Sequence, residues 1–279
     1  MKSRFSFRIA ASALLVGLTM ASGAFAASTW QFTGTSTYTQ TLISGAADPA
    51  ITTIAGYRVT NGGSNAGFTT GWSSQNLASY PSLGMGTDST SAPQHALDNN
   101  GFTEAILLGF GGTSVALSSI GLSYTHNGTT QGVTVDASVF RWTGATAATL
   151  ATVAPNAIAS GAMAGWELVG NYGDFIQDTS QPYNVVNTTG RGSSWWLISA
   201  YNSGFTGALQ TRGSDGFNNG NDYFKVLAVA GSRCAAGAVC GPSTNVPEPS
   251  SLALIALGLL GAVGLRSRRR AAAPATVSA

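Results

Sequence analysis

The chain has 279 residues, and its formal net charge at pH 7 is only +2. Basic residues concentrate near the two ends, so residues 27–245 hold six Lys and Arg against ten Asp and Glu, a net charge of about −4. A nucleic-acid-binding surface requires a basic face, so this composition excludes that class. Charged residues make up 9% of the chain and aromatic residues another 9%, which is typical of a folded exported β-protein rather than a disordered chain.

Residues 1–26 have the pattern of a secretory signal peptide. A basic segment precedes an apolar run at residues 9–20, and an A-x-A sequence follows from Ala24 to Ala26. We therefore expect signal peptidase to cleave after Ala26. A retained membrane anchor is the alternative, and the shortness of the apolar run argues against it. The basic residues of this segment are Lys2, Arg4 and Arg8.

Residues 27–230 are expected to form a single all-β ectodomain. Short runs of apolar, β-branched and aromatic residues recur between Gly-rich and Asn-rich turns, and no amphipathic helix is evident. This spacing predicts a β-sandwich of jelly-roll-like type, with a long connection at residues 64–97. The predicted strands are residues 30–43, 51–60, 104–110, 115–124, 133–142, 146–153, 166–172, 194–201 and 222–229.

Polar side chains cluster before the predicted strand at residues 104–110. Asp98 and Asn100 supply oxygen donors there, and Asp222 could join them from the last strand. Calcium prefers carboxylate, amide and carbonyl oxygens, so one hypothesis is a structural calcium site. The alternative is an Asx turn, in which Asp and Asn side chains bond to nearby backbone groups.

Exposed tryptophans could bind sugars. Trp195 and Trp196 are adjacent in a predicted strand, so their side chains should point to opposite faces of the sheet. One should then lie in the core while the other could be exposed. Trp142 and Trp166 are further candidates, and the alternative for all of them is burial.

No catalytic residues are expected. The sequence has no Gly-x-Ser-x-Gly elbow, no phosphate-cradling loop and no Cys/His spacing for a metal. Acidic residues such as Glu104 and Glu167 could in principle form the carboxylate pair of a glycosidase, but spacing alone brings no two of them together.

The two cysteines, Cys234 and Cys240, lie in a linker at residues 231–245. In an exported protein a disulfide is the expected state for such a pair. Because the loop between them is short, the bond should stabilise a local turn.

The segment at residues 246–270 has three parts in order. A Val-Pro-Glu-Pro turn comes first, and an apolar run at residues 252–265 follows as a predicted transmembrane helix. Four arginines then mark the cytoplasmic side. A plain single-pass anchor is the alternative. The residues concerned are Val246, Pro247, Glu248 and Pro249, and then Arg266, Arg268, Arg269 and Arg270.

This order of parts resembles the PEP-CTERM sorting signal of Gram-negative bacteria. The resemblance implies that exosortase, a membrane protease-transferase, reads and removes the signal. It further implies an inner-membrane-anchored precursor and a mature protein at the cell surface or in the extracellular polymer matrix. Here the arginines are followed by a tail at residues 271–279.

A second resemblance rests on residues 93–101, 104–110, 138–144 and 165–170. In these stretches the ectodomain is similar to a subgroup of exosortase-sorted surface proteins that has no established activity. We therefore expect a non-catalytic role in the envelope or biofilm matrix. A carbohydrate-binding module with exopolysaccharide as its partner and a secreted hydrolase are the alternatives.

Overall fold

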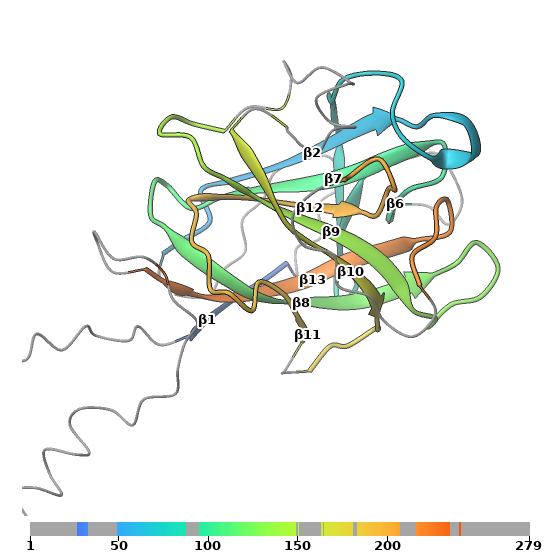
Figure 1. Ribbon diagram of the computed structural model, residues 1–279. Coiled ribbons are helices and arrows are strands. Elements are labelled where there is room, and N and C mark those ends of the chain that lie inside the picture. Colours follow the sequence, from blue (N-terminus) through green and yellow to red (C-terminus); the bar gives the residue numbers. More distant parts are fainter. Residues whose placement is uncertain are drawn as a thin grey trace, which may run out of the picture. The chain divides into compact units, whose positions relative to one another are not determined.

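Figure 1 shows a computed structural model, which describes residues 27–32, 49–87, 95–148, 150, 163, 165–180, 183–206, 216–234 and 240. These residues belong to one compact unit, Ala24–Thr244. The predicted signal peptide and the segment at residues 246–270, with its predicted helix, lie outside the described residues. Within the described part of the chain, no helix is long and apolar enough to cross a membrane.

One sheet has six antiparallel strands in the order β10-β9-β12-β7-β2-β3. Its centre is made by β7 and β12, whose residues pair from Ala105 with Ser199 to Gly109 with Trp195. The strands are β2 (Thr53–Thr60), β3 (Ser73–Gln75), β7 (Phe102–Gly109), β9 (Val135–Trp142), β10 (Trp166–Phe175) and β12 (Trp195–Ala200).

The second sheet has seven strands, of which β11, β8, β13, β5 and β4 lie in this order while β1 and β6 also pair with β13. The long strands β8 and β13 are antiparallel neighbours in the lower half of Figure 1. The strands are β1 (Ala27–Gln31), β4 (Leu77–Tyr80), β5 (Gly84–Thr87), β6 (Leu97–Asp98), β8 (Val115–His126), β11 (Asn184–Val185) and β13 (Tyr223–Arg233).

The two sheets share one core, as the layers of a β-sandwich do. Leu108 of β7 and Trp196 of β12 face Leu122 of β8 and Val226 of β13 in it, and all four are buried. Removal of these apolar surfaces from water is the main favourable term in folding. The shared core therefore explains why the two sheets associate.

The six-stranded sheet also buries its outer face. Leu107, Phe140 and Leu197 alternate with the core residues of their strands, and they pack in a second cluster with Trp72 and Phe205. A sheet that is covered on both faces needs apolar residues at successive positions. This explains the continuous apolar runs in β7 and β12.

The predicted all-β class is confirmed, and β7, β8, β9, β10, β12 and β13 lie close to predicted strands. The long connection predicted at residues 64–97 is wrong, because it contains β3, β4 and β5 and the start of β6. Residues 146–148 of the predicted strand at 146–153 are not in a strand. The jelly-roll-like strand order stays a prediction.

We expect Trp196→Ala to lower the free energy of unfolding by about 3–5 kcal/mol, the usual loss for a large aromatic side chain removed from a core. Trp195→Ala is the matched control, since Trp195 is only partly buried, and it should cost less. Chemical denaturation of both variants measures the difference. Equal losses would contradict the placement of Trp196 in the shared core.

Candidate functional site

Buried polar residues meet where β6, β7, β9 and the start of β13 come together. Asp98, Asn99, Glu104, Asp136 and Asp222 are each at most 2% exposed. Buried carboxylates are costly unless hydrogen bonds or opposite charges compensate them. The partners of each carboxylate therefore decide what this cluster can do.

Asp222 connects the two sheets. Its Oδ2 accepts a hydrogen bond from Asn99 Nδ2 at 2.6 Å, and its Oδ1 accepts one from the backbone N–H of Asp136 at 2.6 Å. The backbone N–H of Asp222 donates in return to Asn99 Oδ1 at 3.0 Å. Because Asp136 belongs to β9 and Asp222 immediately precedes β13, these bonds join the six-stranded sheet to the seven-stranded one.

Asp98 forms the Asx turn that was the alternative to a metal site. Its Oδ1 accepts a hydrogen bond from the backbone N–H of Asn100 at 2.9 Å. Asn100 is exposed, and its side chain hydrogen-bonds to Tyr223. Among the described residues, no group of three or more His, Cys, Asp or Glu side chains is placed to hold a metal ion. Calcium binding by Asp98, Asn100 and Asp222 stays a prediction.

Glu104 is only partly compensated, as is Asp98, whose buried Oδ2 also has no hydrogen-bond partner. The Oε2 of Glu104 is hydrogen-bonded to Thr87 Oγ1 and accepts the backbone N–H of Asp98 at 3.2 Å, but its buried Oε1 has no hydrogen-bond partner. Burial, and then the nearby Asp98 carboxylate, raise the pKa of Glu104 well above its ordinary value of 4.5.

A neutral Glu104 fits its hydrogen bonds. Thr87 Oγ1 lies 3.0 Å from the carbonyl oxygen of Ala96, to which its single proton can be donated. A protonated Glu104 carboxyl can then donate its proton to Thr87 Oγ1. Thr87 thus accepts one hydrogen bond from Glu104 and donates one to the carbonyl oxygen of Ala96. The sequence patterns gave no sign that Glu104 would be buried in this way, because its strand is apolar on both faces.

Trp195 and Trp196 lie on opposite faces of the six-stranded sheet, as the alternation of side chains along a strand predicts. Trp196 is fully buried, and its Nε1 donates to the carbonyl oxygens of Val115 at 3.1 Å and Ser193 at 3.2 Å. A ligand role for Trp196 is therefore wrong, because no ring face is exposed. Trp195 is partly buried on the outer face of the six-stranded sheet, against Gly109. A ligand role for Trp195 stays a prediction.

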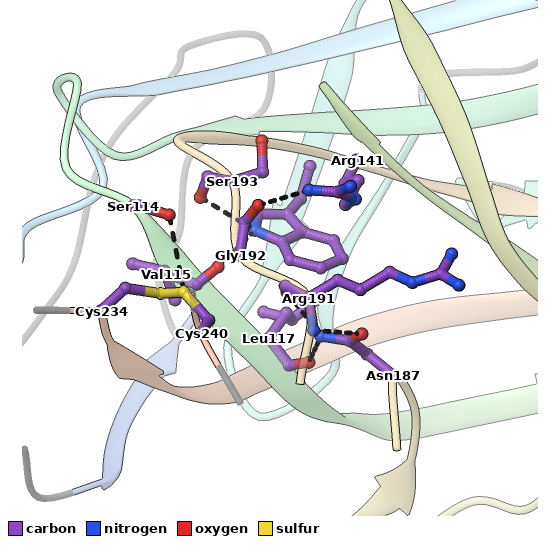
Figure 2. The surroundings of a disulfide bond; sticks show 11 residues. Ser114, Val115, Leu117, Arg141, Asn187, Arg191, Gly192, Ser193, Cys234 and Cys240 are labelled. Carbon is purple, nitrogen blue, oxygen red and sulfur yellow. Dashed lines mark hydrogen bonds between the residues drawn. A yellow bond between two sulfur atoms is a disulfide. The ribbon is translucent and has the colours of Figure 1, made fainter. Parts of the chain in front are cut away.

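The disulfide joins Cys234, which follows β13, to Cys240 in the linker. Figure 2 shows that this bond lies against Gly192 and Ser114. A Cβ atom on Gly192 would overlap the sulfur atoms of both cysteines, so this position requires glycine. The backbone N–H of Cys234 also donates to the carbonyl oxygen of Ser114 at 2.9 Å. The disulfide thus fixes the start of the linker to the folded domain.

The loop that carries Gly192 is itself held by hydrogen bonds from Arg141 and Asn187, which Figure 2 shows, and by ion pairs. Arg141 Nη1 donates to the carbonyl oxygen of Gly192 at 2.9 Å, and its Nε donates to Glu167 Oε2 at 2.8 Å. Arg191 forms a second ion pair with Glu167. Asn187 Nδ2 donates to the carbonyl oxygen of Arg191 at 2.8 Å. Glu167, a candidate hydrolase acid, is therefore engaged by two arginines.

We expect Glu104→Gln to flatten the pH dependence of stability above about pH 4.5, the ordinary pKa of this carboxyl. Between that pH and the raised pKa, the folded protein holds a proton that the unfolded chain has released. Stability from this proton is therefore present at acid pH and is lost as the pH rises. Glutamine is neutral at every pH, so the variant should lack this loss.

The measurement is the free energy of unfolding from pH 4 to 8, with Glu167→Gln as the control. That variant breaks two ion pairs, so it should lose stability at neutral pH. If Glu104→Gln kept the wild-type slope, Glu104 would not be the group that binds the proton.

Comparison with known proteins identifies one part of the chain. Residues 245–270 match the family model of the PEP-CTERM protein-sorting motif. No curated protein matches the chain, and no solved structure does. The match contains the Val-Pro-Glu-Pro sequence, the apolar run and the four arginines. The chain therefore carries a PEP-CTERM protein-sorting motif, which indicates an exosortase-dependent, surface-sorted protein.

Proposed function

We propose that this chain is a non-catalytic surface or matrix protein of a Gram-negative bacterium, acting in the envelope or in the biofilm matrix. The match to the PEP-CTERM motif at residues 245–270 is the observation that carries the proposal. Signal peptidase would remove residues 1–26, and exosortase would then act on a precursor held in the inner membrane by residues 252–265.

The part of the fold nearest in sequence to the motif is consistent with processing at both ends of the chain. The β13 strand ends at Arg233, the disulfide follows at Cys234 and Cys240, and the motif begins at residue 245. Ala27, the first residue after the predicted signal cleavage, pairs with Ser232 near the end of β13. Both predicted processing sites are thus close in sequence to one end of the same strand pair.

The partners of the acidic residues favour a non-catalytic role over a hydrolase. Asp222 accepts two hydrogen bonds between the sheets, Asp98 forms a turn, and Glu167 is paired with two arginines. A glycosidase needs two carboxyls that face a substrate and are free to transfer protons. These three carboxyls already stabilise the fold.

A carbohydrate-binding module is the second candidate, and the partial exposure of Trp195 favours it. Trp142 and Trp166 lie on the same face of the six-stranded sheet, with their ring centroids 5.3 Å apart. We expect neutral polysaccharide to bind the purified protein through Trp195. Binding measured by calorimetry should be lost in Trp195→Ala and kept in Trp195→Phe, and equal binding by both variants would contradict this candidate.

The sorting proposal predicts the fate of a motif variant. Replacement of Pro247, Glu248 and Pro249 by alanine should leave the protein uncut in the membrane fraction, because exosortase would lose its recognition turn. Pro242→Ala is the matched control, since Pro242 lies outside residues 245–270. Cell fractionation and immunoblotting of both variants measure the outcome. Equal release of the two variants would contradict exosortase-dependent sorting.

A further inference from the structure

A lysine lies between two tyrosine rings on the outer face of the seven-stranded sheet. Lys225 Nζ is 4.6 Å from the ring centroid of Tyr80 in β4 and 4.9 Å from that of Tyr124 in β8. Both distances are those of cation–π contacts. Lys225 itself belongs to β13, so three strands of one sheet build this arrangement.

The strand register explains why these side chains meet. Phe224 and Val226 point into the shared core, so Lys225 between them points to the opposite face. Tyr124 pairs with Lys225, whereas Leu122 pairs with Val226, and the register shift between these pairs leaves one extra residue, Ser123, in β8. Because of this β-bulge, the Tyr124 side chain lies on the same face of the sheet as Lys225.

The charge of Lys225 is only partly compensated. The residue is 7% exposed, and burial lowers the pKa of its amine. Within the described part of the chain, Lys225 has the two ring contacts but no hydrogen bond and no ion pair. An ammonium group has three N–H donors, and none of them has a hydrogen-bond acceptor among the described residues.

Both histidines of the chain border this pair of rings. His95 lies against Tyr80, with centroids 5.3 Å apart, and His126 stacks on Tyr124 at 6.0 Å. His126 Nδ1 accepts the backbone N–H of Gly128 at 2.8 Å. The neutral imidazole therefore carries its proton on Nε2, which makes that nitrogen a further donor.

Acidic groups near the site are already engaged. Burial, and to a smaller extent the carboxylates of Asp98 and Asp222, raise the pKa of the neighbouring Tyr223. Each carboxylate is buried, and each accepts backbone or side-chain hydrogen bonds as described above. Among the described residues, neither carboxylate forms an ion pair with Lys225, so its ammonium can pair with an external anion.

We infer that Tyr80, Lys225, Tyr124 and His126, here called the lysine site, bind the carboxylate of an acidic saccharide such as a uronate. The ammonium and the imidazole N–H would hold the carboxylate by charge-assisted hydrogen bonds. The tyrosine hydroxyl groups and ring edges would contact the hydroxyl groups and C–H surface of the sugar. The site is independent of the sorting motif and of Trp195, which lies on the other sheet.

The test is calorimetry of the purified full chain with a galacturonate trimer. Lys225→Met keeps most of the aliphatic stem but removes the charge, and it should weaken binding about tenfold or more, as expected for loss of a charged hydrogen-bond donor. Arg58→Met is the matched control, because Arg58 also stacks on an aromatic ring, 4.5 Å from the Phe102 centroid, but in the other sheet. Its affinity should match that of wild type.

Two ligands separate a saccharide site from a simple anion site. The methyl ester of the same trimer lacks the negative charge and should bind at least tenfold more weakly than the free acid. Acetate supplies a carboxylate without a sugar and should bind weakly as well. Equal affinity for the trimer and its ester, binding of acetate as tight as that of the trimer, or no binding of the trimer would each overturn the inference.

A measurement on the unmodified protein covers the case in which Lys225→Met fails to fold. Burial lowers the pKa of Lys225 in the free protein, and a bound carboxylate should raise it because an opposite charge favours the ammonium. Titration of 13C-labelled lysine by NMR, with and without the trimer, follows this pKa. An unchanged Lys225 pKa at saturating trimer would overturn the inference.

Discussion

The antiparallel pairing of β13 with β8 is the interaction on which the rest of the molecule depends. The ladder runs from Tyr223 with His126 to Arg233 with Val115, and β1, β5 and β6 also pair with β13. Asp222 at its start joins the sheets, Lys225 within it faces outward, and Cys234 at its end fixes the linker. The β13 strand therefore contributes to both the core and the lysine site, and the linker that follows it leads to the sorting motif.

The polar groups between the sheets add specificity to an apolar core. Asp222 accepts two hydrogen bonds, so its burial costs less than that of an isolated charge. Glu104 differs from Asp222 in its charge state, because burial beside Asp98 favours the neutral form of its carboxyl. The same low dielectric strengthens the bonds of Asp222 and raises the pKa of Glu104. The ectodomain thus accommodates buried acidic residues in two ways, through hydrogen bonds to Asp222 and through the raised pKa of Glu104.

Sequence patterns predicted the features that depend on local order. The apolar runs in β7 and β8 showed where the long strands lie. The order of Val-Pro-Glu-Pro, apolar run and arginines predicted a sorting motif at residues 246–270, and the family match covers residues 245–270. The short strands β4 and β5 were missed because a few residues carry too little periodicity. The orientation of Tyr124 depends on the bulge at Ser123, and the burial of Glu104 depends on tertiary packing. Neither leaves a pattern in one sequence.

The intact mass of the protein recovered from the cell surface and culture fluid tests the central claim most directly. Processing at both ends predicts a chain that begins at Ala27 and ends between Val246 and Pro249. Such a mass requires removal of the signal peptide and release from the apolar segment at residues 252–265. A recovered chain that still contains residues 252–279 would instead be a plain membrane anchor and would contradict exosortase-dependent sorting.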